Sequence, residues 1–238
     1  MQRYFVDTTV TVGKSYQMDQ THHHHIKNVM RSQVDDEFTV VDLNSVAYLV
    51  KLTSLEPLEY VVLEAFDHDV ELPVNVTIYS PILKGDKMDV VMQKSTELGA
   101  YSFVLYKADR SVVKLNGKKE KARLERYNKI VRESAEQSKR TIIPEVNFSE
   151  KLKDIDFSTY DLVLFAYEDY NFSGAAIKSV LEHFKGKSIA FVFGPEGGFT
   201  SDEVQIFKDD SNVSLGPRIL RAETAPLYAL SVIGSYFE

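Results

Sequence analysis

A glycine-rich segment near the C-terminal end has the residue types of a ligand-binding loop. Gly194-Pro195-Glu196-Gly197-Gly198 follows an apolar run over residues 189–193 and precedes a helix start signal, Thr200-Ser201-Asp202-Glu203. Glycine lets a ligand approach the backbone, and open α/β sheets bind ligands where a strand ends and a helix begins. The segment lacks the Gly-Lys-Ser/Thr of a phosphate-binding loop and the spacing of a dinucleotide fingerprint. An ordinary tight turn is the alternative interpretation.

A second segment with the residue types of a site, Leu215-Gly216-Pro217-Arg218-Ile219-Leu220-Arg221, leads into Ala222-Glu223-Thr224-Ala225. Helix signals explain part of it, because Thr224 suits an N-cap and Glu223 suits the positive end of a helix dipole. These helix signals do not explain why two arginines, Arg218 and Arg221, lie in the same short segment. Together the two segments predict a small-molecule site.

An α/β domain with a mostly parallel sheet must position these segments, because apolar strand-like runs alternate with amphipathic helices from residue 74 onward. Thr200-x-x-Glu203 is a capping box, and Ser173 is the expected cap of an earlier helix. The expected strands are 74–79, 102–106, 162–166, 189–193 and 213–215, and the expected helices are 86–98, 118–138, one after Ser173, one after Thr200, and 225–237.

The N-terminal part has a different pattern, with short β-branched and aromatic runs at 37–41, 47–52 and 60–64 separated by turn residues. This pattern predicts a small β-barrel over residues 1–70, interrupted by a helix around His22–Met30 with Thr21 as N-cap. Residues 71–238 would then form the α/β domain.

Composition excludes several classes of protein. The 238 residues include no cysteine, so disulfides, thiolate zinc sites and a cysteine nucleophile are absent. No run of signal-peptide or membrane-span type occurs, and a cytoplasmic protein is expected. Consecutive histidines at 22–25 would point in different directions on a helix, so no metal site is predicted.

Charge is distributed unevenly. The net charge is −7, yet residues 107–140 hold 12 of the 28 basic residues and only 5 of the 35 acidic ones. A basic segment on an acidic body favours a polyanionic partner such as RNA. A solvated helix face is the alternative interpretation.

With these residues in view, the chain resembles the SPOUT class of S-adenosylmethionine-dependent RNA methyltransferases. The resemblance rests above all on Gly-Pro-Glu-Gly-Gly followed by Leu-Gly-x-x-Ile-Leu-Arg-x-Glu-Thr-Ala. Within the class, the chain is similar to the family that methylates ring nitrogen 3 of a uridine in bacterial small-subunit ribosomal RNA. Further matching segments extend over nearly the whole chain, at residues 1–5, 24–31, 84–88, 93–99, 110–111, 133–140 and 143–144.

The resemblance implies a fold and a set of cofactor contacts. The α/β domain would contain a trefoil knot, the N-terminal barrel would be a PUA-like RNA-binding module, and the protein would be a homodimer. Three loops would hold S-adenosylmethionine. Their cofactor-binding residues would be Phe165, Ala166, Glu168, Gly194, Pro195, Glu196, Gly198, Leu215, Gly216, Ile219, Leu220 and Arg221.

The implied chemistry is methyl transfer from a sulfonium to a ring nitrogen, which is a poor nucleophile until its proton leaves. We expect Arg221 to stabilise the developing anion or orient the substrate, and Glu223 to assist deprotonation. The residues expected to contact RNA are Arg3, His24, His25, Arg31, Arg110, Gln137 and Arg140.

Three alternatives stay open at this point. The chain could methylate another RNA nucleotide, or be a non-catalytic RNA-binding factor of ribosome assembly. It could also use another nucleotide, although Glu196 inside the glycine segment disfavours a phosphate ligand.

Overall fold

The computed structural model describes residues 1–66, 70–111, 117–167, 174–207 and 211–238. It separates into two compact units, the first made of Met1–Glu71 with Ala135–Ile142 and the second of Leu72–Ser134 with Ile143–Glu238. Residues 135–142 therefore belong to the first unit, although local pattern assigned them to the α/β domain.

The first unit is built on a five-stranded mixed sheet with the order β1-β3-β4-β5-β2. The pair β1/β3 is parallel and the other pairs are antiparallel. Its buried face includes Val40, Val50 and Tyr60. The strands are β1 Arg3–Phe5, β2 Ser15–Gln17, β3 Glu37–Val41, β4 Ala47–Leu55 and β5 Leu58–Phe66.

The helical segment of the first unit differs from expectation. Helix α1 covers Gln20–His24 and continues as a π-helix over His25–Val29. Thr21 lies inside the helix, and the N-cap position falls on Asp19, which makes no side-chain cap hydrogen bond. The helix starts earlier because the rings of His22 and His23 bond the carbonyl oxygens of Phe5 and Met18, at 3.0 and 2.9 Å, which anchors this turn.

The second unit contains a five-stranded parallel sheet with the order β8-β7-β6-β11-β9. Its strands are β6 Asn75–Pro81, β7 Ser102–Tyr106, β8 Glu145–Ser149, β9 Leu162–Ala166 and β11 Ser188–Phe193. Sequence pattern predicted all of these except the edge strand β8. A small parallel pair, β10 Ala175–Ala176 with β12 Val213–Ser214, completes the unit's sheets.

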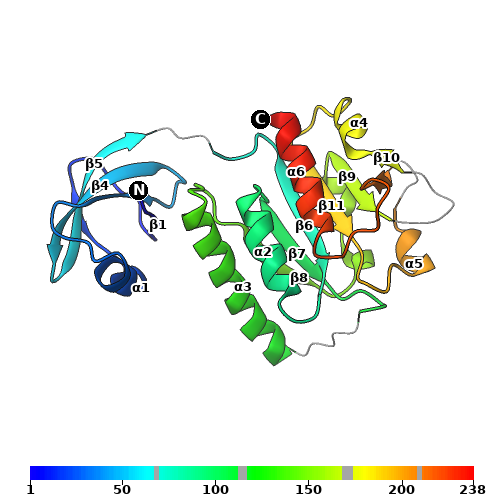
Figure 1. Ribbon diagram of the computed structural model, residues 1–238, viewed down its shortest axis with the longest axis horizontal. Helices are drawn as coiled ribbons and strands as arrows, with labels where there is room; N and C mark the ends of the chain where they lie inside the picture. The colour runs from blue at the N-terminus through cyan, green and yellow to red at the C-terminus, as the bar shows by residue number, and fades with distance from the viewer. Residues whose placement is uncertain (67–69, 112–116, 168–173, 208–210) are drawn as a thin grey trace. The chain divides into compact units, whose positions relative to one another are not determined.

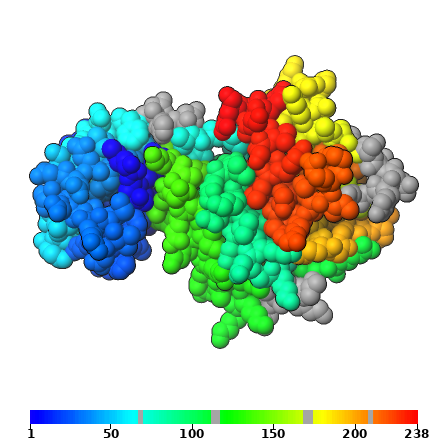
Figure 2. Space-filling view, viewed as in Figure 1, coloured from blue at the N-terminus to red at the C-terminus, as the bar shows by residue number. Residues whose placement is uncertain are grey.

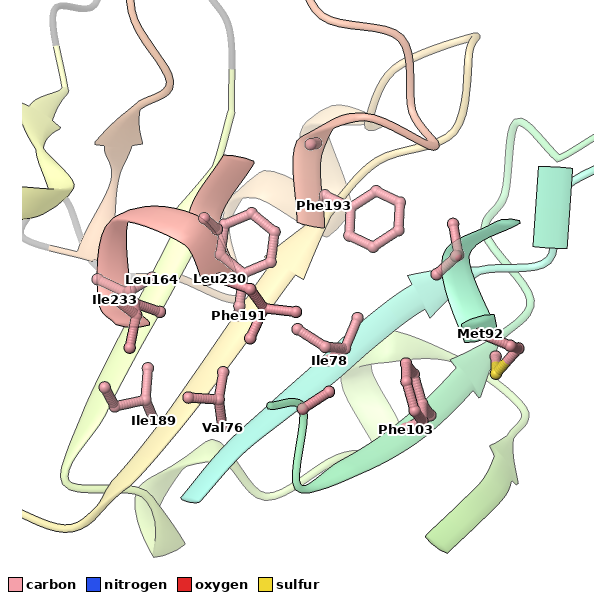
Figure 3. Close-up of a cluster of buried hydrophobic side chains, with 14 of the residues drawn as sticks. Val76, Ile78, Met92, Phe103, Leu164, Ile189, Phe191, Phe193, Leu230 and Ile233 are labelled. Carbon is pink, nitrogen blue, oxygen red and sulfur yellow. The ribbon is translucent and has the colours of Figure 1, made fainter. Parts of the chain in front are cut away.

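Successive side chains of β11 point to opposite faces of the sheet and enter two different cores. Ile189, Phe191 and Phe193 lie in the larger core, whereas Ala190 and Val192 lie in the smaller one. Figure 3 shows Leu230 and Ile233 close to Phe191 and Ile189 in the larger core. Burial of the side chain of Phe191 or of Phe193 stabilises the fold by roughly 2–3 kcal/mol.

Four helices contribute side chains to the larger core, and helix α6 runs along the sheet beside α2 (Figure 1). The other face is covered by two short 3-10 turns at 152–154 and 157–159 and by residues around α5. The helices are α2 Lys87–Glu97, α3 Gly117–Gln137, α4 Ile177–Leu181, α5 Ser201–Val204 and α6 Ala225–Phe237. Among the described residues, no helix combines the length and apolar character needed to cross a membrane.

Candidate active site

Strand order places two chain segments at one edge of the parallel sheet. From β6 the chain adds β7 and β8 on one side, and then returns so that β11 lies against the other side of β6. Such a reversal opens a crevice at the carboxyl ends of the two strands. Here β11 ends in the glycine loop, residues 194–198, and β6 leads to the start of α2 at Lys87.

A cavity of about 670 Å³ lies at this edge. The glycine loop, the loop 215–221 and the end of β9 form most of its wall. The space-filling view shows the segment with loop 215–221 at the surface beside α6 (Figure 2). Its lining residues are Lys87, Ala166, Tyr167, Gly174, Phe193–Glu196, Gly198, Phe199, Val213–Ala222 and Ala225.

The glycine loop is a tight turn whose shape depends on its glycines. The Gly198 amide donates to the Pro195 carbonyl oxygen at 2.9 Å, and Gly198 has a φ of +68°. A Cβ on Gly194 would lie 2.8 Å from the Phe199 ring. The loop ends at the predicted capping box, which the structure confirms between Thr200 and Glu203.

The loop 215–221 is anchored by its backbone and presents its long side chains to solvent. Gly216 has a φ of +93°, and its amide donates to Ser214 Oγ at 3.2 Å. The Arg221 carbonyl oxygen accepts from the amides of Thr224 and Ala225, which fixes the entry into α6. The side chains of Arg218, Ile219 and Arg221 are exposed at the cavity.

Lys87 lines the cavity and contacts two carboxylates, Glu196 on the cavity wall and Glu223, which is not among the lining residues. Sequence reasoning missed Lys87 as a site residue. Its Nζ lies 2.5 Å from Glu196 Oε1 and 3.5 Å from Glu223 Oε2. The hydrogen bond from Lys87 lowers the pKa of Glu196, and the same bond raises the pKa of Lys87. Glu223 Oε2 is buried and accepts no hydrogen bond from the described part of the chain. Lys87 lies in residues 84–88, one of the segments that carry the family resemblance. Its contacts with Glu196 and Glu223 depend on strand order, which the sequence does not show.

Most of the expected cofactor residues border the cavity, with two exceptions. Phe165 is 2% exposed and does not line the cavity, because its ring stacks on Phe207 with the ring centroids 4.0 Å apart. Its expected cofactor contact stays a prediction. Glu168, and also Ser173, lie outside the described residues. The expected residues on the cavity wall are Ala166, Gly194, Pro195, Glu196, Gly198, Leu215, Gly216, Ile219, Leu220 and Arg221.

Several residues expected to contact RNA have accessible side chains. Arg110 is exposed beside the glycine loop, where its Nη1 donates to the Gly197 carbonyl oxygen at 3.2 Å. His24, Arg31 and Gln137 are exposed in the first unit. His25 is half-buried, and its Nδ1 lies 2.9 Å from the Tyr4 hydroxyl. Their contact with RNA stays a prediction.

Arg3 and Arg140 have internal roles instead, which corrects the expectation that they contact phosphates. Arg3 is 3% exposed and donates to the carbonyl oxygens of Lys139 and Arg140. Arg140 donates through Nε and Nη2 to Glu71 Oε2, at 2.9 and 2.5 Å. The hydrogen bonds of these two buried guanidinium groups stabilise the first unit.

Part of the positive charge in residues 107–140 is neutralised within the second unit. Lys107 pairs with Glu120 and Glu150, at 2.8 and 2.7 Å, and Arg126 pairs with Asp89. The segment therefore offers a weaker field to a polyanion than its composition indicates. The described residues contain no cluster of three potential metal ligands, and His22 and His23 are bonded to backbone carbonyls as noted above.

Comparison with known proteins identifies the family. The family described as RNA methyltransferase domain matches residues 70–234, and the family described as RNA methyltransferase PUA domain matches residues 24–64. The chain belongs to the RNA methyltransferase family. The second unit thus has an α/β methyltransferase fold, and the first contains a PUA domain.

Relatives of this RNA methyltransferase match it over nearly its whole length. Ribosomal RNA small subunit methyltransferase E of Bacillus subtilis is 40% identical over 249 residues, which cover 98% of this chain and 96% of the relative. A crystal structure of ribosomal RNA small subunit methyltransferase E from Neisseria gonorrhoeae, bound to S-adenosyl methionine, has a TM-score of 0.85 and 29% identity. It covers 100% of this chain, and this chain covers 98% of it.

Proposed function

We propose that the protein methylates small-subunit ribosomal RNA with S-adenosylmethionine as the methyl donor. The observation that carries the proposal is the cavity at the carboxyl ends of β6, β9 and β11. The glycine loop and the loop 215–221 form much of its wall. The names of the relatives support the RNA substrate, since they act on ribosomal RNA of the small subunit. A protein with this substrate works in the cytoplasm, where that RNA is assembled into subunits.

The residues at the cavity fit S-adenosylmethionine. Apolar side chains such as Leu215, Ile219 and Leu220 suit a purine ring, and the backbone at Gly194, Gly198 and Gly216 allows close approach. Glu196 places a carboxylate on the cavity wall, which suits a cationic ligand. When bound, S-adenosylmethionine supplies an electrophilic methyl group on a positively charged sulfur.

The chain's own residues then serve the nucleotide that accepts the methyl group, and we assign nitrogen 3 of a uridine as the acceptor. Its proton must leave before the nitrogen can attack, so a carboxylate and a cation are the groups required. Glu223 takes the role of base and Arg221 stabilises the negative charge left on the ring. Arg221 ends the loop 215–221, and Glu223 lies in the turn that leads into α6.

The finer architecture follows the same family. The segment from Asn212 to Arg221 would thread through a loop as a trefoil knot, and the sheet of the first unit would close into a PUA-like barrel. The parallel bridge of Asn212 with Phe165 places the start of this segment beside the end of β9. In the homodimer that the family implies, the partner subunit would cover Ile219, which is 76% exposed at the cavity.

Nucleoside mass spectrometry of ribosomal RNA tests the proposed function. Small-subunit RNA from a strain that lacks the gene should lose 3-methyluridine, and the purified protein with S-adenosylmethionine should restore it. Persistence of 3-methyluridine would reject the target atom. Loss of a different methylated nucleoside would keep the methyltransferase and change its target.

A further inference from the structure

Lys87 occupies a position where a helix does not favour a cation. It is the first residue of α2, and the N-terminus of a helix carries partial positive charge. The cation is held there by carboxylates from two other parts of the chain, Glu196 in the glycine loop and Glu223 before α6. The side chain is 35% exposed and lines the cavity.

The three residues come from segments that strand order brings together. Lys87 follows β6 and Glu196 follows β11, which is the parallel neighbour of β6. Glu223 follows the loop 215–221, which forms another part of the cavity wall. One side chain therefore connects three segments that surround the same space.

We propose that Lys87 is a positioning residue of the cavity, which holds the glycine loop through Glu196 and the entry to α6 through Glu223 in the arrangement that accepts S-adenosylmethionine. The role rests on the proposed function, because it concerns that cofactor. A half-exposed ion pair adds little to stability. We therefore expect the loss of Lys87 to leave the fold nearly as stable, so that its effect is read in cofactor binding.

Calorimetry with S-adenosylmethionine alone, without RNA, tests this role on the full chain. Lys87→Met keeps the side-chain length and removes the charge, and we expect Kd to rise about tenfold or more, because small misplacements in a site have large effects. Lys87→Arg should restore most of the affinity. Lys94→Met is the matched control, because Lys94 lies on the same helix and pairs with Glu97 at 2.9 Å, outside the cavity wall.

A double-mutant cycle shows whether Lys87 acts through Glu196. If it does, Lys87→Met combined with Glu196→Gln weakens binding much less than the sum of the two single effects. The pH dependence gives a second signature. The bond from Lys87 lowers the pKa of Glu196, so the wild type should keep its affinity until the pH falls below the ordinary 4.5 of a glutamate and then lose it. The affinity of Lys87→Met should not depend on the protonation of Glu196.

Each outcome decides something. An unchanged Kd in Lys87→Met, or the same change in Lys94→Met, overturns the positioning role and leaves the proposed function intact. A wild-type protein that binds no S-adenosylmethionine overturns the proposed function itself. If methylation by Lys87→Met shows a lower kcat with an unchanged KM for S-adenosylmethionine, Lys87 acts on the reaction and the positioning role is wrong.

Discussion

The hydroxyl of Tyr106 donates a hydrogen bond of 2.7 Å to the carbonyl oxygen of Phe193. Tyr106 is the last residue of β7, and Phe193 is the last residue of β11 before the glycine loop. Both residues are buried, and burial raises the pKa of Tyr106 well above its usual value, so its hydroxyl stays protonated. The bond ties the base of the glycine loop to a strand two positions away in the sheet.

Tyr106→Phe removes this hydroxyl and leaves a buried carbonyl oxygen without that donor. We expect a loss of about 1–3 kcal/mol in the free energy of unfolding, since an unmatched buried polar group costs that much. Urea unfolding measures the loss. Tyr101→Phe is the control, because Tyr101 is exposed. Equal stability of the two variants would contradict the prediction.

Gly194→Ala tests the shape of the glycine loop. The added Cβ would lie 2.8 Å from the ring of Phe199, which is buried and packs against Phe165 with the ring centroids 4.7 Å apart. Because Phe199 has little room to move, the loop must shift, and we expect Kd for S-adenosylmethionine to rise about tenfold or more. Gly117→Ala is the matched control, since its Cβ meets no atom within 4 Å.

Glu223→Gln tests the proposed base, because glutamine keeps the shape and cannot accept the proton. We expect kcat to fall at least about 100-fold, the usual contribution of a general base. The Kd for S-adenosylmethionine should change less than kcat, since glutamine keeps a side-chain oxygen for the 3.5 Å contact to Lys87. Methylation under single-turnover conditions measures the step, and full turnover with normal RNA binding would reject the role.

The elements that hold the site could be predicted from sequence because their signals are local. The runs 102–106 and 162–166 and the helix 225–237 were predicted with the bounds that the structure has. Strand β8 was missed because only Val146 and Phe148 are apolar in it, as suits an edge strand. Lys87 was missed as a site residue because its neighbours depend on strand order.

Burial of charged side chains could not be predicted, because it depends on partners far away in sequence. Arg140 bonds Glu71, which lies 69 positions earlier in the chain. Local sequence gives no sign of such a distant partner, so Arg3 and Arg140 were both predicted to be exposed cations. Phe165 stands next to the loop that follows β9, and only tertiary packing directs its ring into the core. Sequence therefore predicted the two loops of the cavity, but it did not predict Lys87 as a site residue or the burial of Phe165.

Asp161 gives a prediction about pH. Its Oδ2 accepts from the amides of Lys187 and Ser188, at 2.8 and 2.9 Å, and these bonds lower the pKa of Asp161 below its ordinary 3.8. A lowered folded-state pKa contributes stability above the unfolded-state pKa, and the contribution disappears as the pH falls through the folded-state value. Asp161→Asn should therefore be less stable than the wild type at neutral pH. The difference should shrink below about pH 4, as urea unfolding at several pH values will measure.

Variants of Arg140 and Arg31 compare a buried structural arginine, Arg140, with an exposed candidate RNA contact, Arg31. The side chains of Arg140 and Glu71 are 4% and 15% exposed, so Arg140→Ala leaves a buried carboxylate without its main cation. We expect a loss of about 3 kcal/mol or more in the free energy of unfolding. Arg31 is exposed, so Arg31→Ala should leave stability within about 0.5 kcal/mol of the wild type and reduce the slope of RNA affinity against salt.

The two arginine variants are compared in urea unfolding and in RNA binding at several salt concentrations. For Arg140→Ala, the salt slope should stay that of the wild type under conditions where the variant is folded, because a buried guanidinium releases no counterion from RNA. A reduced slope together with unchanged stability would make Arg140 a phosphate contact and contradict its assignment as an internal tie. For Arg31→Ala, an unchanged slope would remove Arg31 from the RNA-binding surface, whatever its exposure.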